Sequence, residues 1–228
     1  MRIFSVTGGT ETGVRFEDQS KLRLESRYSE VLEGGHIPEK KLEDMDTDGV
    51  YGEVIYPTLG ITLWRLPDTA LLNAIQRGYN DWIAEFCNAY PARLRGLAMI
   101  VLDNEITAAA AELERCAKMG LVGAIIPVYP TPGEFYDDPK YDHFWATAEG
   151  LRMPLSLHRA TNRPGSFTAP EVPYDRAVLT APDRVNAENW VRQTLCHLIF
   201  SGVLERFPHL RFVQLEHELG WIPFFLDR

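Results

Sequence analysis

Cysteine is scarce in this sequence, and long apolar runs are missing from it. Three of the 228 residues are cysteines, and Cys87, Cys116 and Cys196 lie far apart within helical patterns. This spacing excludes a disulfide framework and a zinc ribbon, and it fits a reducing compartment. No apolar run approaches the length of a membrane helix, and no signal-peptide core follows Met1. We therefore predict a cytoplasmic protein without a membrane partner.

Positive charge is also low. The sequence has 23 Lys and Arg residues against 32 Asp and Glu residues, which gives a formal net charge of −9. A general nucleic-acid binder needs clustered Lys and Arg side chains to neutralise phosphates. We therefore expect no nucleic-acid partner.

Several catalytic motifs do not occur. No G-x-G-x-x-G or Walker loop follows a predicted strand, so a nucleotide-binding α/β fold loses support. No G-x-S-x-G elbow is present to carry a serine nucleophile. Pairs of the H-x-H or H-E-x-x-H type and Cys clusters are absent too. A metal site would therefore have to collect its three or four ligands from distant parts of the chain.

What the sequence does contain is a regular alternation of apolar strands and amphipathic helices. Strands are predicted at residues 49–58, 94–102, 122–129, 154–158 and 211–216. Helices are predicted from Pro67 to Tyr90, from a cap at Asp103 or Asn104 to Gly120, from Asp138 to Gly150, and over 186–206. Such alternation predicts a parallel sheet with right-handed crossovers, covered by helices on both faces.

A (β/α)8 barrel of the TIM type and a doubly wound sheet both fit this alternation. The barrel is favoured because no phosphate-binding loop is present, and about five of its eight βα units are visible. We assign residues 46–228 to a partial barrel domain of the metal-dependent hydrolase type, and residues 1–45 to an N-terminal arm or hairpin. In the arm, residues 3–6 and 14–16 flank a Gly-rich loop, and residues 17–33 form a short helix or a solvated segment.

Two histidines lie where predicted strands end. His158 closes the strand 154–158, and His217 follows the strand 211–216 between Glu216 and Glu218. In α/β barrels, catalytic side chains lie at the carboxyl ends of the strands. Each histidine could instead be structural, and the two glutamates could be a solvated turn.

The alternation of side chains leaves open which residue after the last strand points inward. His217 has the same parity as Val213 and Leu215, whereas Glu216 has the parity of Phe212. Glu216 therefore points inward if the strand continues through it, and His217 can do so if the strand ends earlier.

Three loops follow strand ends and are expected to border a substrate: residues 57–65, 128–138 and 159–184. The third is long enough to be a functional lid or a disordered segment. Arg159 or Arg65 could pair with a substrate carboxylate. Apolar walls could come from Trp64, Phe135, Tyr136 and Phe167, whereas Trp82, Trp145 and Trp190 fall on helix stripes and are expected in the core.

Four segments resemble a known family. They are 44-DMDTDGVYGEVIYPT-58, 154-PLSLH-158, 201-SGVLERFPHLRFV-213 and 217-HELGWIPFFLDR-228. In this order they resemble the amidohydrolase-2 branch of the amidohydrolase superfamily, the metal-dependent barrels related to aminocarboxymuconate-semialdehyde decarboxylase. No single motif is diagnostic, but the ordered set is specific and covers roughly residues 40–228.

This resemblance implies a function and roles for the two histidines. The family binds a divalent metal, usually zinc, through an H-x-H pair, a His on strand five and an Asp on strand eight, and uses a His after strand six as general acid/base. By resemblance, His158 is the metal ligand and His217 is the catalytic residue. The implied enzyme is a hydrolase or decarboxylase of a small carboxylated or cyclic substrate, in which the metal lowers the pKa of a bound water to about 7. Glu216, with Arg159, Arg65 and Trp64, is a candidate for substrate binding.

The sequence departs from the family pattern at both ends. No H-x-H pair precedes residue 44, and no strand-eight Asp follows Arg228. We therefore expect a truncated version of a longer enzyme that binds zinc weakly and substoichiometrically and does not turn over. The alternative is a non-catalytic barrel fragment that serves as a binding module or forms a homo-oligomer through its open sheet edges.

Overall fold

Parallel strands lie at the centre of the structure, a computed structural model that describes residues 2–4, 25–27, 31–57, 60–103, 105–164 and 189–228. The strands are β3 (Glu53–Ile55), β4 (Leu94–Gly96), β5 (Ala98–Met99), β6 (Ala124–Ile126), β7 (Leu155–His158) and β8 (Phe212–Leu215). Strand β3 pairs with β4, and β5 to β8 form a four-stranded parallel sheet in chain order. A doubly wound sheet reverses its strand order at a switch point. The described strands show no such reversal, so the order favours the barrel.

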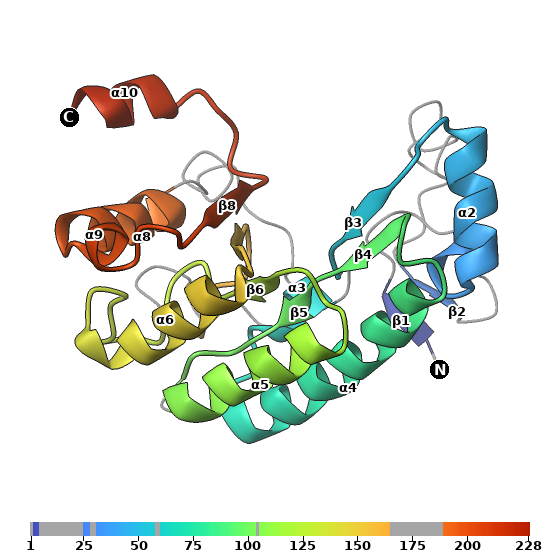
Figure 1. The fold of residues 1–228 in the computed structure, drawn as a ribbon, viewed down its shortest axis with the longest axis horizontal. Helices are drawn as coiled ribbons and strands as arrows, with labels where there is room; N and C mark the ends of the chain where they lie inside the picture. Colours follow the sequence, from blue (N-terminus) through green and yellow to red (C-terminus); the bar gives the residue numbers. More distant parts are fainter. Residues whose placement is uncertain (1, 5–24, 28–30, 58–59, 104, 165–188) are drawn as a thin grey trace.

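Helices follow the strands around this arc in the order of the chain (Figure 1). The larger ones are α2 (Pro38–Thr47), α4 (Thr69–Asn88), α5 (Ile106–Lys118), α6 (Asp142–Leu151) and α8 (Asn189–Phe200). Shorter turns are η3 (Glu33–Gly35), α3 (Gly60–Leu63), η4 (Pro139–Tyr141), α9 (Val203–Arg206) and α10 (Ile222–Asp227). In Figure 1, α2 and α10 lie at opposite ends of the arc. Within the described residues, no helix is long and apolar enough to cross a membrane.

Helices α4 and α5 lie where the sequence predicts helices. Asp68 caps α4, since its side chain accepts a hydrogen bond of 3.0 Å from the Leu71 amide. The apolar stripe of α5 is buried as predicted, from Ile106 to Cys116. Gly120 follows α5 with a φ of +94°, a left-handed conformation that glycine adopts without strain.

Side-chain alternation gives the strands two faces with separate cores. Ala98 pairs with Ala124, and Ala124 pairs with Leu155; all three belong to the larger core, which also contains α5 and α6 residues. The neighbouring positions, Met99 and Ile125, belong to a second core together with Trp64 and others. We call the face that carries Met99, Ile125 and Ser156 the inner face, and both faces are buried as the sequence predicts.

Several predictions need correction. Strand β1 (Arg2–Phe4) pairs antiparallel with β2 (Glu25–Arg27), so residues 25–27 are neither helix nor solvated arm. The predicted partner, residues 14–16, lies outside the described residues. Helix α2 spans the domain boundary placed at residues 45 and 46, and Met45 on it is buried in the larger core.

Trp82 does not lie in the core, in contrast to the buried Trp145. Its side chain is 42% exposed, and its ring packs against Phe86 and Tyr79 on the surface of α4, with centroids 5.4 and 6.1 Å apart. These neighbours are four and three residues away, so the ring is covered along its own helix instead of by the sheet. Trp190 is partly buried against the larger core.

Candidate functional site

His158 is the last residue of β7 and lies on the inner face. It follows Ser156 by two positions and therefore shares its face, because successive strand residues point in opposite directions. The Ser156 hydroxyl lies 3.1 Å from the hydroxyl of Tyr56, which follows β3 on the far side of the sheet order. The ring of Tyr56 lies 6.2 Å from that of His158. Two strand ends distant in sequence thus meet at this face. The sequence does not single out Tyr56, because nothing in its local pattern distinguishes it from other strand residues.

The hydrogen bonds of His158 decide which ring nitrogen carries its proton. Nδ1 lies 2.7 Å from the Arg159 carbonyl oxygen, which can only accept, so Nδ1 donates. The lone pair is then on Nε2, which lies 3.9 Å from the nearer carboxylate oxygen of Glu216. An imidazole held through Nδ1 with Nε2 available is the form that binds metals. Only 6% of the surface of His158 is exposed.

Strand β8 ends at Leu215, and this settles the orientation of the residues after it. Glu216 has a φ of +58°, which breaks the alternation of the strand. As a result the Glu216 side chain is 69% exposed, whereas His217 is 3% exposed and buried. His217 Nε2 lies 3.2 Å from the Leu157 carbonyl oxygen on β7, and the His217 carbonyl accepts a 2.6 Å hydrogen bond from the Trp221 indole.

The remaining predicted site residues lie in different surroundings. Arg159 is half-buried directly after His158, and Arg65 is exposed. Trp64 has no exposed surface and packs in the inner-face core. Tyr136 is likewise buried and donates to the Pro127 carbonyl at 2.7 Å, whereas Phe135 is exposed and stacks on His197. Phe167 and most of the loop 159–184 lie outside the described residues.

A buried ion pair connects the loops beside these strand ends. Arg163 and Asp103 are 2% and 5% exposed, and Arg163 Nε donates to Asp103 Oδ2 at 2.8 Å. The same carboxylate accepts 2.8 Å hydrogen bonds from Thr69 and from Thr131. Arg163 also donates to the carbonyl of Trp64. Asp103 therefore joins the loops that follow β3, β5, β6 and β7.

The predicted role of Asp103 as a helix cap is wrong. Helix α5 has Glu105 at its N-cap position, without a side-chain cap bond. Asp103 is instead committed to Arg163, which is 60 residues away. Its position at a strand end was visible in the sequence, but its partner was not, because a pairing over this separation leaves no local pattern.

The side chains around the two histidines are of the types that bind a divalent metal, but they are too few for a complete site. His158 Nε2 and the Glu216 carboxylate are suitable ligands, and they lie on adjacent strand ends. Among the residues that the structure describes, however, no three His, Cys, Asp or Glu side chains form a group that could hold a metal ion. We therefore derive no reaction step through a metal from the described residues.

Parallel strands in chain order, helices outside them and ionisable side chains at the carboxyl strand ends define a chain of the (β/α)8-barrel class. The chain belongs to the amidohydrolase family, whose sequence pattern matches residues 34–226. This family assignment confirms the resemblance found in the sequence.

Two curated relatives carry the same description. A gamma-resorcylate decarboxylase from Polaromonas sp. is 27% identical over 82% of this chain and 61% of its own length. A gamma-resorcylate decarboxylase from Rhodococcus jostii is 31% identical over 72% of this chain and 50% of its own length. The chain thus spans about half to three fifths of these relatives.

Solved structures of this family share the fold. A 2,6-dihydroxybenzoate decarboxylase from Rhizobium matches with a TM-score of 0.61 and 25% identity, over 76% of this chain and 54% of that one. A dihydroxybenzoic acid decarboxylase from Polaromonas sp., solved with manganese and the inhibitor 2-nitroresorcinol, matches with a TM-score of 0.59 and 23% identity, over 78% and 54%. The prediction of a partial α/β barrel of the TIM type is confirmed.

Proposed function

We propose that this chain belongs to a metal-dependent decarboxylase that acts on a small aromatic carboxylate. The observation that carries the proposal is His158, held through Nδ1 at the end of β7 with Nε2 facing Glu216. The curated relatives, named as decarboxylases, support lyase chemistry over the hydrolysis that the sequence left equally open. The substrate is inferred from those same names.

Each side chain has a proposed role. His158 would be a metal ligand, with Glu216 beside it, and a divalent metal held there in the full-length enzyme would supply a positive charge that polarises the substrate. Zinc is the metal that the resemblance implies, and manganese is the metal in the related Polaromonas structure. Arg159 would pair with the substrate carboxylate. As the C–C bond breaks and CO2 leaves, His217 would deliver a proton to the ring carbon.

Trp64 and Arg65 would contribute differently. Trp64 would support the inner face by packing, since its ring is buried there, and Arg65 is an exposed cation that could attract an anionic substrate.

We also keep the division into an N-terminal arm and a barrel domain as a proposal. Its boundary should lie before α2, because Met45 packs into the larger core.

Product analysis tests this function. A version of the chain extended to the full length of its relatives should release CO2 from 2,6-dihydroxybenzoate in the presence of zinc or manganese. In that version His217→Ala should keep the metal and lose about 100-fold or more in rate, as loss of a general acid does. His143→Ala, an exposed histidine on α6, is the control. Turnover that survives complete metal removal would contradict the mechanism, and a hydrolytic product without CO2 would identify a hydrolase.

A second candidate function, a non-catalytic binding or oligomer-forming module, is favoured by one observation. Strand β8 is an edge of its sheet among the described strands, and several large apolar side chains from residue 200 onward are exposed. The most exposed are Phe200, Leu219, Phe224 and Leu226. Light scattering of the 228-residue chain tests this alternative, because pairing of open edges should give dimers or larger species. A stable monomer at high concentration would count against it.

A further inference from the structure

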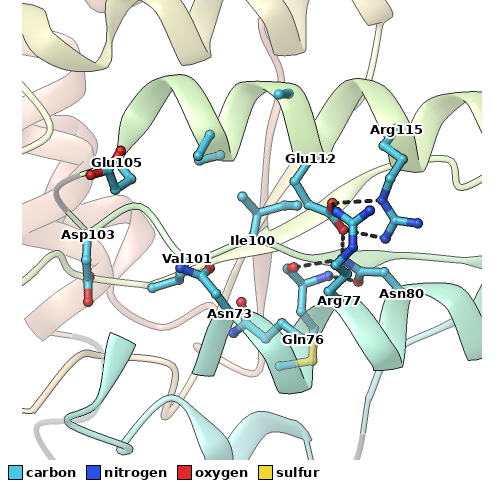
Figure 2. Close-up of a pocket in the computed structure, with 14 residues that line it drawn as sticks. Asn73, Gln76, Arg77, Asn80, Ile100, Val101, Asp103, Glu105, Glu112 and Arg115 are labelled. Atoms are coloured by element: carbon cyan, nitrogen blue, oxygen red, sulfur yellow. Dashed lines mark hydrogen bonds and ion pairs between the residues drawn. The ribbon is translucent and has the colours of Figure 1, made fainter. Parts of the chain in front are cut away.

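A pocket of about 500 Å³ lies between α4 and α5 (Figure 2). Its floor consists of Met99, Ile100 and Val101, at and directly after β5. Figure 2 shows Gln76 and Asn80 on the α4 side and Glu112 on the α5 side. His158, Arg159, Glu216 and His217 do not line it.

Two side-chain amides on α4, those of Asn80 and Gln76, differ in their hydrogen bonding. Asn80 is fully buried, accepts from the Met99 amide at 2.8 Å and donates to the Met99 carbonyl at 3.2 Å. Gln76 lies one helical turn earlier on the same face and is 2% exposed, yet neither its amide nitrogen nor its oxygen has a hydrogen-bond partner among the residues that the structure describes. Gln76 lines the pocket. A buried amide is costly when it is unpaired, so its position at a cavity indicates a partner that enters the cavity.

The surroundings of Gln76 define the chemistry of that partner. Most charged groups of the pocket already have partners, since Glu112 pairs with Arg77 and Arg115, and Asp103 pairs with Arg163; the remaining charged side chain in the lining, Glu105, is exposed. A neutral ligand is therefore favoured. Ile100 and Val101 offer an apolar floor, and the Gln76 amide offers a donor and an acceptor side by side.

We propose that this pocket binds a neutral, planar heterocycle with a lactam edge. The ring N–H and C=O of the lactam would pair with the Gln76 amide as the backbone of Met99 pairs with Asn80. This site is independent of the proposed decarboxylase chemistry and needs neither a metal nor His158.

Calorimetry and NMR titration with 2-pyridone test the proposal on the 228-residue chain. We expect saturable binding, at least about tenfold weaker binding of 2-methoxypyridine, and a similar loss in Gln76→Leu, because two neutral hydrogen bonds disappear. Gln193→Leu, an exposed glutamine on α8, is the matched control and should bind normally. His158→Ala should bind normally too, which separates this site from the proposed function.

A second variant tests the pocket without altering Gln76, so that the result does not depend on whether Gln76→Leu folds correctly. Ala108 is exposed and lines the pocket, so Ala108→Phe should block entry without removing a hydrogen bond. Binding of 2-pyridone that is as strong in Gln76→Leu and in Ala108→Phe as in the unaltered chain overturns the proposal. A crystal structure at saturating 2-pyridone in which only water meets Gln76 overturns it as well.

Discussion

At the scale of single residues, His158 and Glu216 have the geometry of two ligands without a complete site. Their nearest donor atoms are 3.9 Å apart, which is too long for a hydrogen bond. Ligand atoms of one zinc ion lie about 3 Å apart, because each bond to the metal is about 2 Å. A small movement of the exposed Glu216 side chain would therefore let both atoms reach one ion.

Metal content is the first prediction at this scale. Two protein ligands leave most of the coordination to water, so the 228-residue chain should bind zinc or manganese weakly and below one equivalent. His158→Ala should abolish this binding, and Glu216→Gln should weaken it. His143→Ala should have no effect. Elemental analysis after dialysis measures the occupancy, and full occupancy in the unaltered chain would show that further residues complete the site.

The second prediction concerns the ion pair of Asp103 and Arg163. Both side chains are buried, so Arg163→Gln leaves the Asp103 charge in the interior without its partner. Removal of one member of a buried pair costs about 3–5 kcal/mol. Lys40→Gln removes an exposed pair with Glu43 and should change the free energy of unfolding little. Urea unfolding compares the two, and a small loss in Arg163→Gln would show that water reaches Asp103.

At the scale of elements, Glu112 joins α4 to α5. Its carboxylate accepts from Arg115 Nη2 and from Arg77 Nη1, both at 2.6 Å, and from Asn80 at 3.0 Å. Burial raises the pKa of Glu112, but the hydrogen bonds from Arg115 and Asn80 and the two guanidinium charges outweigh burial and lower it. The charged form is therefore the one that holds the helices together.

The pH dependence of this contact is the third prediction. Because the pKa is lower in the folded chain than in the unfolded chain, Glu112 stabilises the fold fully above the unfolded pKa of about 4.3. That contribution is lost as the pH falls through the lower folded pKa. Glu112→Gln should cost about 1–2 kcal/mol at neutral pH and progressively less in acid.

The exposed neighbour Glu114 provides the control for Glu112. Glu114→Gln should change the free energy of unfolding little at any pH. Urea unfolding at several pH values measures both variants. A stability difference for Glu112→Gln that grows on acidification would reverse the sign and contradict the assignment.

At the scale of the whole molecule, one core extends from α2 to α8. It includes Met45 on α2, Leu113 on α5 and Leu198 on α8. Elements far apart in the arc of Figure 1 are thus linked through shared apolar contacts. Such a core should open as a unit, since its parts lose buried area together.

Thiol labelling tests this cooperativity and is the fourth prediction. Burial raises the pKa of Cys87 to about 11, and burial together with the nearby Glu112 carboxylate raises the pKa of Cys116 to about 12. Thiolate is the reactive form, so both should resist a disulfide reagent at neutral pH, whereas the half-buried Cys196 should react first. With added urea, Cys87 and Cys116 should become reactive together. Reaction of one well before the other would show that the core opens in parts.

The sequence alone determined the elements and their order. Apolar periods along the chain predicted the strands of the parallel arc, with β4 and β5 as one strand over 94–102, and also the buried stripe of α5 and the stop at Gly120. These features depend on residues close in sequence, whose spacing records the local conformation. The same logic placed His158 at the end of a strand.

The tertiary structure decided what depends on distant partners or on one backbone angle. The early end of β8 and the positive φ of Glu216 decided that His217 is buried, a question that the alternation had left open. Asp103 binds Arg163 instead of capping a helix, and Gln76 is enclosed without a hydrogen-bond partner in the described part of the chain. A hydrogen bond between residues 60 positions apart forms only when the sheet has brought them together. The sequence near either residue therefore carries no record of it.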